Sequence, residues 1–251
     1  MARKRVKCWA SVLGGCGGGQ SREHYFTQGL YAGNVIVSGL PWAQGRSIDL
    51  PIGALASNIL CGDHNEALSP VDGEAIRMKN FVVKAVEASS RDAPPRREYC
   101  SVDGRKIIRW LSKFICNVVT LGRRAPEPVY VRRAFAQPNA PVHVYVHKFF
   151  PVKDDADTSH IHFEEWIARL KSGGETALYI LRFAIMEWLV APLALTQYEC
   201  NVLGHLTQGQ HLFEAKPLDR TRKLWLGPRV SGNKTTFTHQ LNLLIPRTRQ
   251  T

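Results

Sequence analysis

The chain lacks a long uninterrupted apolar run. Its longest candidate, residues 176–195, contains Arg182, Glu187 and Pro192, which indicates buried strands or a core helix and not a membrane span. The N-terminus is basic, but the apolar part after Lys7 is too short and too rich in glycine to be the core of a signal peptide. We therefore expect a cytoplasmic protein with no membrane partner. In that compartment cysteines stay reduced, so a cysteine cluster is more often a metal site than a disulfide framework.

Acidic residues are scarce. Only 21 Asp and Glu residues stand against 33 Lys and Arg residues, which gives a net charge of +12. This balance predicts a polyanionic partner, with nucleic acid first, although many basic proteins simply stay soluble this way. Residues 96–145 carry 10 basic and 3 acidic side chains, a net of +7, so we expect a phosphate-contacting surface there. The glycine-dense residues 14–21 do not form a P-loop, because no Gly-Lys-Ser/Thr follows them.

Two segments have helical periodicity. Residues 71–89 repeat apolar side chains at helical spacing, and Ser69 and Asp72 are candidate caps for this helix. Residues 102–122 give the clearest amphipathic pattern in the chain, and Gly122 is a plausible stop. Its basic side chains are expected to lie largely off the apolar face: Arg105, Lys106, Arg109 and Lys113.

Strand-like patterns dominate from residue 128 onward, with a short helix predicted at 160–170. The fold class is therefore predicted to be α+β, with a small metal-bearing module at residues 1–90 and a linker at 91–101. Residues 102–251 would hold the basic helix and a mostly β C-terminal region, which is a possible surface for a protein partner.

The thiols and the imidazole best suited to meet at one metal ion are Cys8, Cys16, Cys61 and His64. Structural zinc takes four nitrogen or sulfur ligands in a tetrahedron, usually as two close pairs from two segments. Cys61 and His64 have standard spacing, while Cys8 and Cys16 are further apart and need the glycines at 14–19 to fold back. The alternative is that Cys8 and Cys16 are incidental residues on a flexible arm.

Between the two pairs lies "SREHYF" at 21–26, and the second pair belongs to "NILCGDHNEALS" at 58–69. In this order the segments resemble the zinc-bearing branch of the HNH endonucleases and, more loosely, uncharacterised bacterial HNH-like proteins. The resemblance covers roughly residues 8–75. It implies a ββα-metal (HNH-like) module that zinc stabilises, and a bacterial or phage origin. The chain departs from the family pattern where Glu23 replaces Asp and Ala56 replaces Asn, and in lacking the proline that follows His24.

The resemblance implies hydrolysis of phosphodiester bonds, in DNA more than in RNA. His24 would be the general base, and Glu23 and Asn65 would be ligands of a catalytic Mg²⁺ or Mn²⁺ ion. Each residue has a structural alternative: His24 stacks on its neighbour, Glu23 forms an ion pair with Arg22 or Lys7, and Asn65 caps a helix.

The second hypothesis is a non-catalytic, zinc-stabilised nucleic-acid-binding protein with a degenerate HNH site. A third is an interaction protein whose C-terminal region carries the function. Two further histidine pairs, His143 with His147 and His160 with His162, would each lie on one face of their segment if that segment is extended. Either pair could supply metal ligands, but a solvated strand face is the commoner reason for such a pattern.

Overall fold

The computed structural model describes residues 8–89, 98–137, 139–146, 160–169, 175–183, 186–192, 222–231 and 234–244. The helices are α1 (Gly62–Ser89), α2 (Gly104–Leu121) and α3 (Pro128–Ala134), with 3-10 turns η1 (Trp9–Leu13), η2 (Gln28–Leu30) and η3 (Ile52–Ala54). The strands are β1 (Gln20–His24), β2 (Asn34–Ser38), β3 (Ile48–Pro51), β4 (Ala56–Cys61), β5 (Glu98–Asp103), β6 (His143–Val146), β7 (His160–Arg169), β8 (Glu175–Phe183), β9 (Met186–Ala191), β10 (Arg222–Ser231) and β11 (Lys234–Leu244). This mixture of helices and sheets confirms the α+β class.

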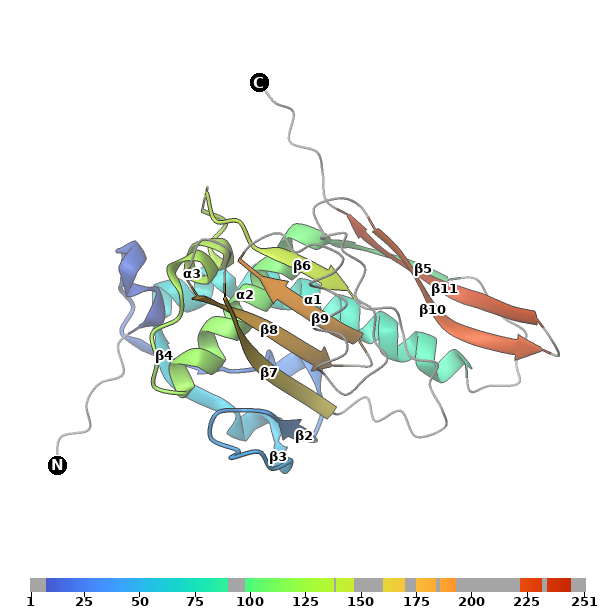
Figure 1. The fold of residues 1–251 in the computed structure, drawn as a ribbon, viewed down its shortest axis with the longest axis horizontal. Coiled ribbons are helices and arrows are strands. Elements are labelled where there is room, and N and C mark those ends of the chain that lie inside the picture. Colours follow the sequence, from blue (N-terminus) through green and yellow to red (C-terminus); the bar gives the residue numbers. More distant parts are fainter. Residues whose placement is uncertain are drawn as a thin grey trace, which may run out of the picture.

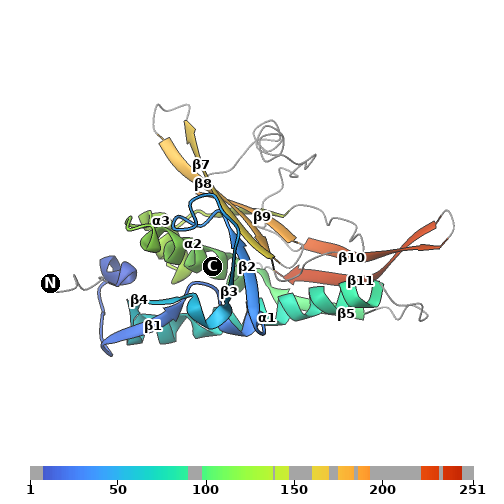
Figure 2. The same ribbon diagram turned by 90° about the horizontal axis from the view of Figure 1, so that it is seen from below.

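The described strands form three sheets. β1 and β4 make an antiparallel pair, and α1 follows β4 without a break. A six-stranded sheet has the order β3-β2-β7-β8-β9-β6, and a third sheet has the order β10-β11-β5. In Figure 1 the long helix α1 runs from the β1–β4 pair to the β5–β10–β11 sheet, and Figure 2 shows the same arrangement from below.

Helix α2 lies at the centre of the hydrophobic core. It sits between α1 and the six-stranded sheet (Figure 2), and its Phe114 ring contacts Phe26 on one side and Phe163 of β7 on another. The side chain of Asp103 caps its first turn by accepting hydrogen bonds from the backbone N–H groups of the next two residues. Its apolar face is buried as predicted, but so is Lys113, which the sequence pattern put off that face.

Helix α1 begins at Gly62, nine residues before the predicted start, and contains Pro70. Proline removes one backbone hydrogen bond. The buried apolar stripe of the helix already includes Leu68, before Pro70, so packing against the core stabilises the helix on both sides of the proline. Asp72 is consequently a mid-helix residue and not a cap.

Two other local predictions were wrong. Residues 128–134, predicted as strand, form α3, where Pro128 occupies the first turn and Tyr130, Val131 and Ala134 are buried at helical spacing. Residues 160–169, predicted as helix, form β7. There Ile161 and Phe163 are buried while their neighbours are not, a period of two that hydrogen bonding to β2 and β8 enforces.

The predicted linker falls partly outside the described residues, while residues 98–101 belong to β5, which pairs in parallel with β11. One hydrophobic core contains side chains from before and after this segment, including Val71 and Ala75 of α1 with Leu111 and Ile115 of α2. Of the described helices, none is long and apolar enough to cross a membrane.

Candidate metal centre and active site

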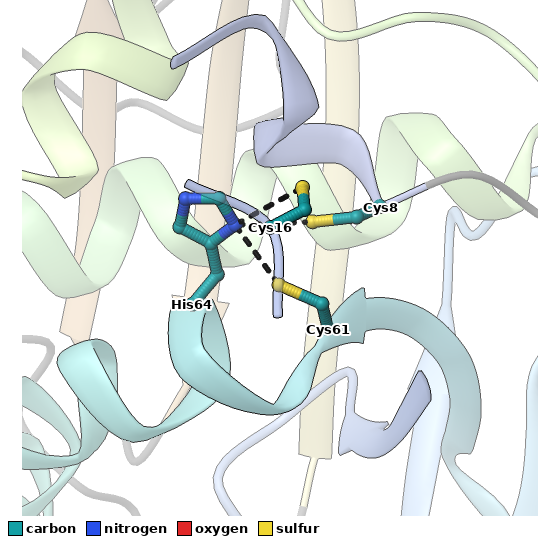
Figure 3. A group of neighbouring side chains, drawn as sticks. All are labelled: Cys8, Cys16, Cys61 and His64. Atoms are coloured by element: carbon teal, nitrogen blue, oxygen red, sulfur yellow. Dashed lines mark hydrogen bonds between the residues drawn. The ribbon is translucent and has the colours of Figure 1, made fainter. Parts of the chain in front are cut away.

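Three thiols and one imidazole meet at one end of the β1–β4 pair (Figure 3). The Nδ1 atom of His64 lies 3.4 Å from Sγ of Cys8, 3.6 Å from Sγ of Cys16 and 3.1 Å from Sγ of Cys61. All four ligand atoms lie within 4.8 Å of one another. Bond lengths of about 2.3 Å to sulfur and about 2.0 Å to nitrogen put ligand atoms roughly 3.6 Å apart in a tetrahedron. The four residues therefore could hold a metal ion such as zinc, as predicted.

Glycines bring the two halves of this cluster together. Cys8 precedes η1, Cys16 lies in the glycine-dense segment 14–19, and that segment folds back onto the corner between β4 and α1. The N–H of Gly62 donates to the carbonyl of Gly19, at 2.9 Å. A Cβ on Gly62 would lie 2.8 Å from the carbonyl oxygen of Gly18, so the close approach needs glycine.

The thiols differ in how readily they ionise. Burial raises the pKa of the Cys8 thiol to about 12. Burial also acts to raise the pKa of Cys61, but hydrogen bonds from the backbone of His64 and Gly17 outweigh it, so that pKa is lowered. Metal ligation requires thiolates, so loading this cluster would release protons and would add its binding free energy to folding.

Glu23 does not pair with Arg22. Its carboxylate is buried, and Oε1 lies 2.7 Å from the ammonium of Lys113 and accepts a 3.3 Å hydrogen bond from Asn117. Lys113 also bonds both carboxylate oxygens of Asp72, at 3.0 and 2.7 Å. Burial raises the pKa of Glu23, and the charge of Lys113 opposes that effect. An ion at this oxygen of Glu23 would have to displace the Lys113 ammonium.

Asn65 lies in the first turn of α1, and its amide donates to the hydroxyl of Ser21, at 2.8 Å. Arg22 lies at a bulge in β1, which changes the register between Ser21 and Glu23. The cysteine–histidine cluster is the one group of three or more His, Cys, Asp or Glu ligands that comes together among the described residues. The assignment of Glu23 and Asn65 to a catalytic Mg²⁺ or Mn²⁺ ion therefore stays a prediction.

His24 is the last residue of β1, half-buried, and its Nδ1 is buried without a hydrogen-bond partner. Burial and the charge of Arg22 lower its pKa, while a hydrogen bond with the backbone of Ile52 acts in the opposite direction, and the net shift favours the neutral imidazole. The end of this strand is fixed by α2, because Asn117 donates to the backbone carbonyl of His24, at 3.3 Å, and accepts from the indole of Trp9, at 2.9 Å.

Sequence reasoning missed the polar residues of α2 that organise this region. Lys113 and Asn117 are four residues apart and flank the apolar residues 114–116, and that interruption was the available signal. Comparisons with protein-family models, curated proteins and solved structures find no match to this chain.

Proposed function

We propose that the chain hydrolyses phosphodiester bonds of nucleic acid, with the imidazole of His24 as the general base. The observation that carries this proposal is the position of His24 on the last residue of β1. Its strand pairs with β4, α1 follows directly, and the cysteine–histidine cluster lies at the other end of the pair. This order of elements and ligands is the one expected of a zinc-stabilised ββα-metal module.

The lowered pKa of His24 and the exposed guanidinium beside it support this role. A general base near neutral pH must be unprotonated and must accept a proton from the attacking water. Arg22 next to it is exposed, with one guanidinium nitrogen donating to the carbonyl of Gly53, at 3.2 Å. The same positive charge that lowers the His24 pKa would attract a phosphate group. Other exposed arginines on α2 and α3 and in the turn between them would add phosphate contacts: Arg105, Arg123 and Arg132.

Plasmid nicking tests the proposal. Supercoiled DNA is incubated with wild-type protein, His24→Ala and the control His143→Ala, with Mg²⁺ or Mn²⁺ added, and zinc content is measured first to verify each fold. We expect cleavage by wild type and the control, and a rate lower by about 10²- to 10⁴-fold in His24→Ala. Equal cleavage by all three proteins would refute the role of His24.

The ion pair of Glu23 favours a second candidate, a zinc-stabilised protein that binds nucleic acid without cutting it. Lys113 neutralises the carboxylate that the HNH resemblance assigns to the catalytic ion. This candidate predicts salt-sensitive DNA binding, with affinity falling linearly on a log–log plot against salt, and no cleavage with either ion. Binding that does not weaken with salt would count against both candidates and favour a protein partner.

A further inference from the structure

A second cluster of chemically active side chains lies where β2 meets β7 in the six-stranded sheet, far in sequence from the cysteines. The two strands are parallel, with Ile36 opposite His160 and Ser38 opposite His162. The hydroxyl of Ser38 lies 3.0 Å from Nε2 of His160 and 2.7 Å from Nδ1 of His162. Two imidazole nitrogens from one strand therefore converge on a single small group of its neighbour.

The other ring nitrogen of His162 has a carboxylate partner. Its Nε2 lies 2.5 Å from Oε1 of Glu164, two residues further along the same strand face. A carboxylate here favours the proton on Nε2 and leaves the lone pair of Nδ1 facing the Ser38 hydroxyl. Metal-bound histidines usually have this type of partner on the nitrogen that does not ligate, because it fixes the tautomer and raises ligand basicity.

Strand β7, which contains both histidines, packs into the core and lies close to β2. Ile161 and Phe163, between and beside the histidines, are buried in the core, while His160 is exposed and His162 half-buried. Gly39, directly after β2, has φ +72°, and a Cβ there would lie 1.7 Å from the carbonyl oxygen of Phe163. β2 and β7 therefore meet too closely for a side chain at that point, and the imidazoles project from a preorganised support.

We propose that His160 and His162 form a metal site for a divalent ion that favours imidazole nitrogen, such as Zn²⁺, Ni²⁺, Cu²⁺ or Co²⁺. Glu164 orients His162, and Ser38 lies beside the ion. This site is distinct from the cysteine cluster and does not depend on the proposed nuclease activity. We do not expect Mg²⁺ to bind at His160 and His162, because that ion prefers oxygen donors.

The ligand set and the neighbouring residue Arg182 bear on how tightly this site would hold a metal ion. Arg182 of β8 lies directly opposite His162 in the β7–β8 pair. Two imidazoles with one nearby carboxylate thus define an open site of moderate affinity and not a closed structural one.

Cobalt titration of the tag-free, zinc-loaded full chain tests this site. We expect one further equivalent of Co²⁺ to bind with visible d–d bands and without the thiolate charge-transfer band of a cysteine site. His160→Ala and His162→Ala should each weaken this binding at least 10-fold, and Glu164→Gln by about 10- to 100-fold. His143→Ala, a histidine on another strand of the sheet, should bind as wild type does.

Two results of this titration would contradict the proposed histidine site. No second equivalent in the wild type, or a second equivalent whose affinity is unchanged in His160→Ala and His162→Ala, would overturn the assignment. Retained zinc and an unchanged near-ultraviolet circular dichroism spectrum show that each variant is folded. Because Co²⁺ binding is read by absorbance, the result is independent of whether the protein cleaves DNA.

Discussion

Replacing Lys113 by Met should destabilise the protein strongly, because this ammonium is the shared partner of two carboxylates inside the core. The Lys113 and Glu23 side chains are only 4% and 5% exposed, and that of Asp72 is 20% exposed. Methionine has a similar shape, so the change removes the charge and its hydrogen bonds while keeping most of the packing.

We expect Lys113→Met to lower the free energy of unfolding by about 3–5 kcal/mol, the usual penalty for leaving one partner of a buried ion pair without its counter-charge. Most of it should come from Glu23, which keeps the 3.3 Å hydrogen bond from Asn117. Asp72 loses less, because it is partly solvated and still accepts from the Thr27 hydroxyl, at 2.6 Å. Burial already raises the Glu23 pKa, so the variant's penalty should shrink at low pH, where the carboxyl becomes protonated and neutral.

Urea unfolding followed by tryptophan fluorescence measures this loss. Glu23→Gln in the Lys113→Met background should recover part of the lost stability, since the unpaired charge is gone, and the double-mutant cycle gives the coupling. The matched control is Lys84→Met, whose lysine is 60% exposed and paired with Glu98 at 2.8 Å; its expected cost is about 0.2–1 kcal/mol. A Lys113→Met cost no larger than that of Lys84→Met would refute the reasoning.

Other predictions concern the cluster, the sheet and His24. Cys61→Ser should abolish tightly bound zinc and lower the melting temperature, as should a chelator on wild type; one zinc per chain retained in Cys61→Ser would contradict the cluster. Gly39→Ala should cost about 1–3 kcal/mol more than Gly33→Ala, measured by urea unfolding, because both glycines have positive φ but only Gly39 would meet Phe163. The pKa of His24 in the folded state lies below its ordinary value of 6.5. Neutral His24 therefore contributes its whole stabilisation above pH 6.5, and this contribution is lost as pH falls through the folded-state pKa. His24→Gln should flatten this dependence between pH 5 and 7.5, and an unchanged profile would show that His24 is not its source.

At the metal centre, the ligands could be predicted from the sequence because residue type and spacing along the chain indicate them. Cys61 and His64 are three residues apart at a strand-to-helix corner, and glycines at 14–19 permit the return of Cys16, so ligand type and spacing suffice to predict the cluster. The core face of α2 could be predicted for the same reason, because a period of 3.6 residues is a local property.

Other features depend on partners distant in the chain. Lys113 resembles any solvent-exposed lysine until folding puts Glu23 and Asp72, 90 and 41 residues away, against its ammonium. Residues 160–169 resemble a helix until β2 and β8 pair with them on both edges.

By itself the sequence determined the types of ligand in the cysteine–histidine cluster, the spacing of Cys61 and His64, the central helix and the basic charge, because each follows from residue type and short-range spacing. Only the tertiary structure decided that Glu23 faces a lysine and that Ser38 lies between two histidines more than 120 residues away. Those contacts arise from strand pairing and core packing, whose free energy comes from surfaces that no short window of sequence contains.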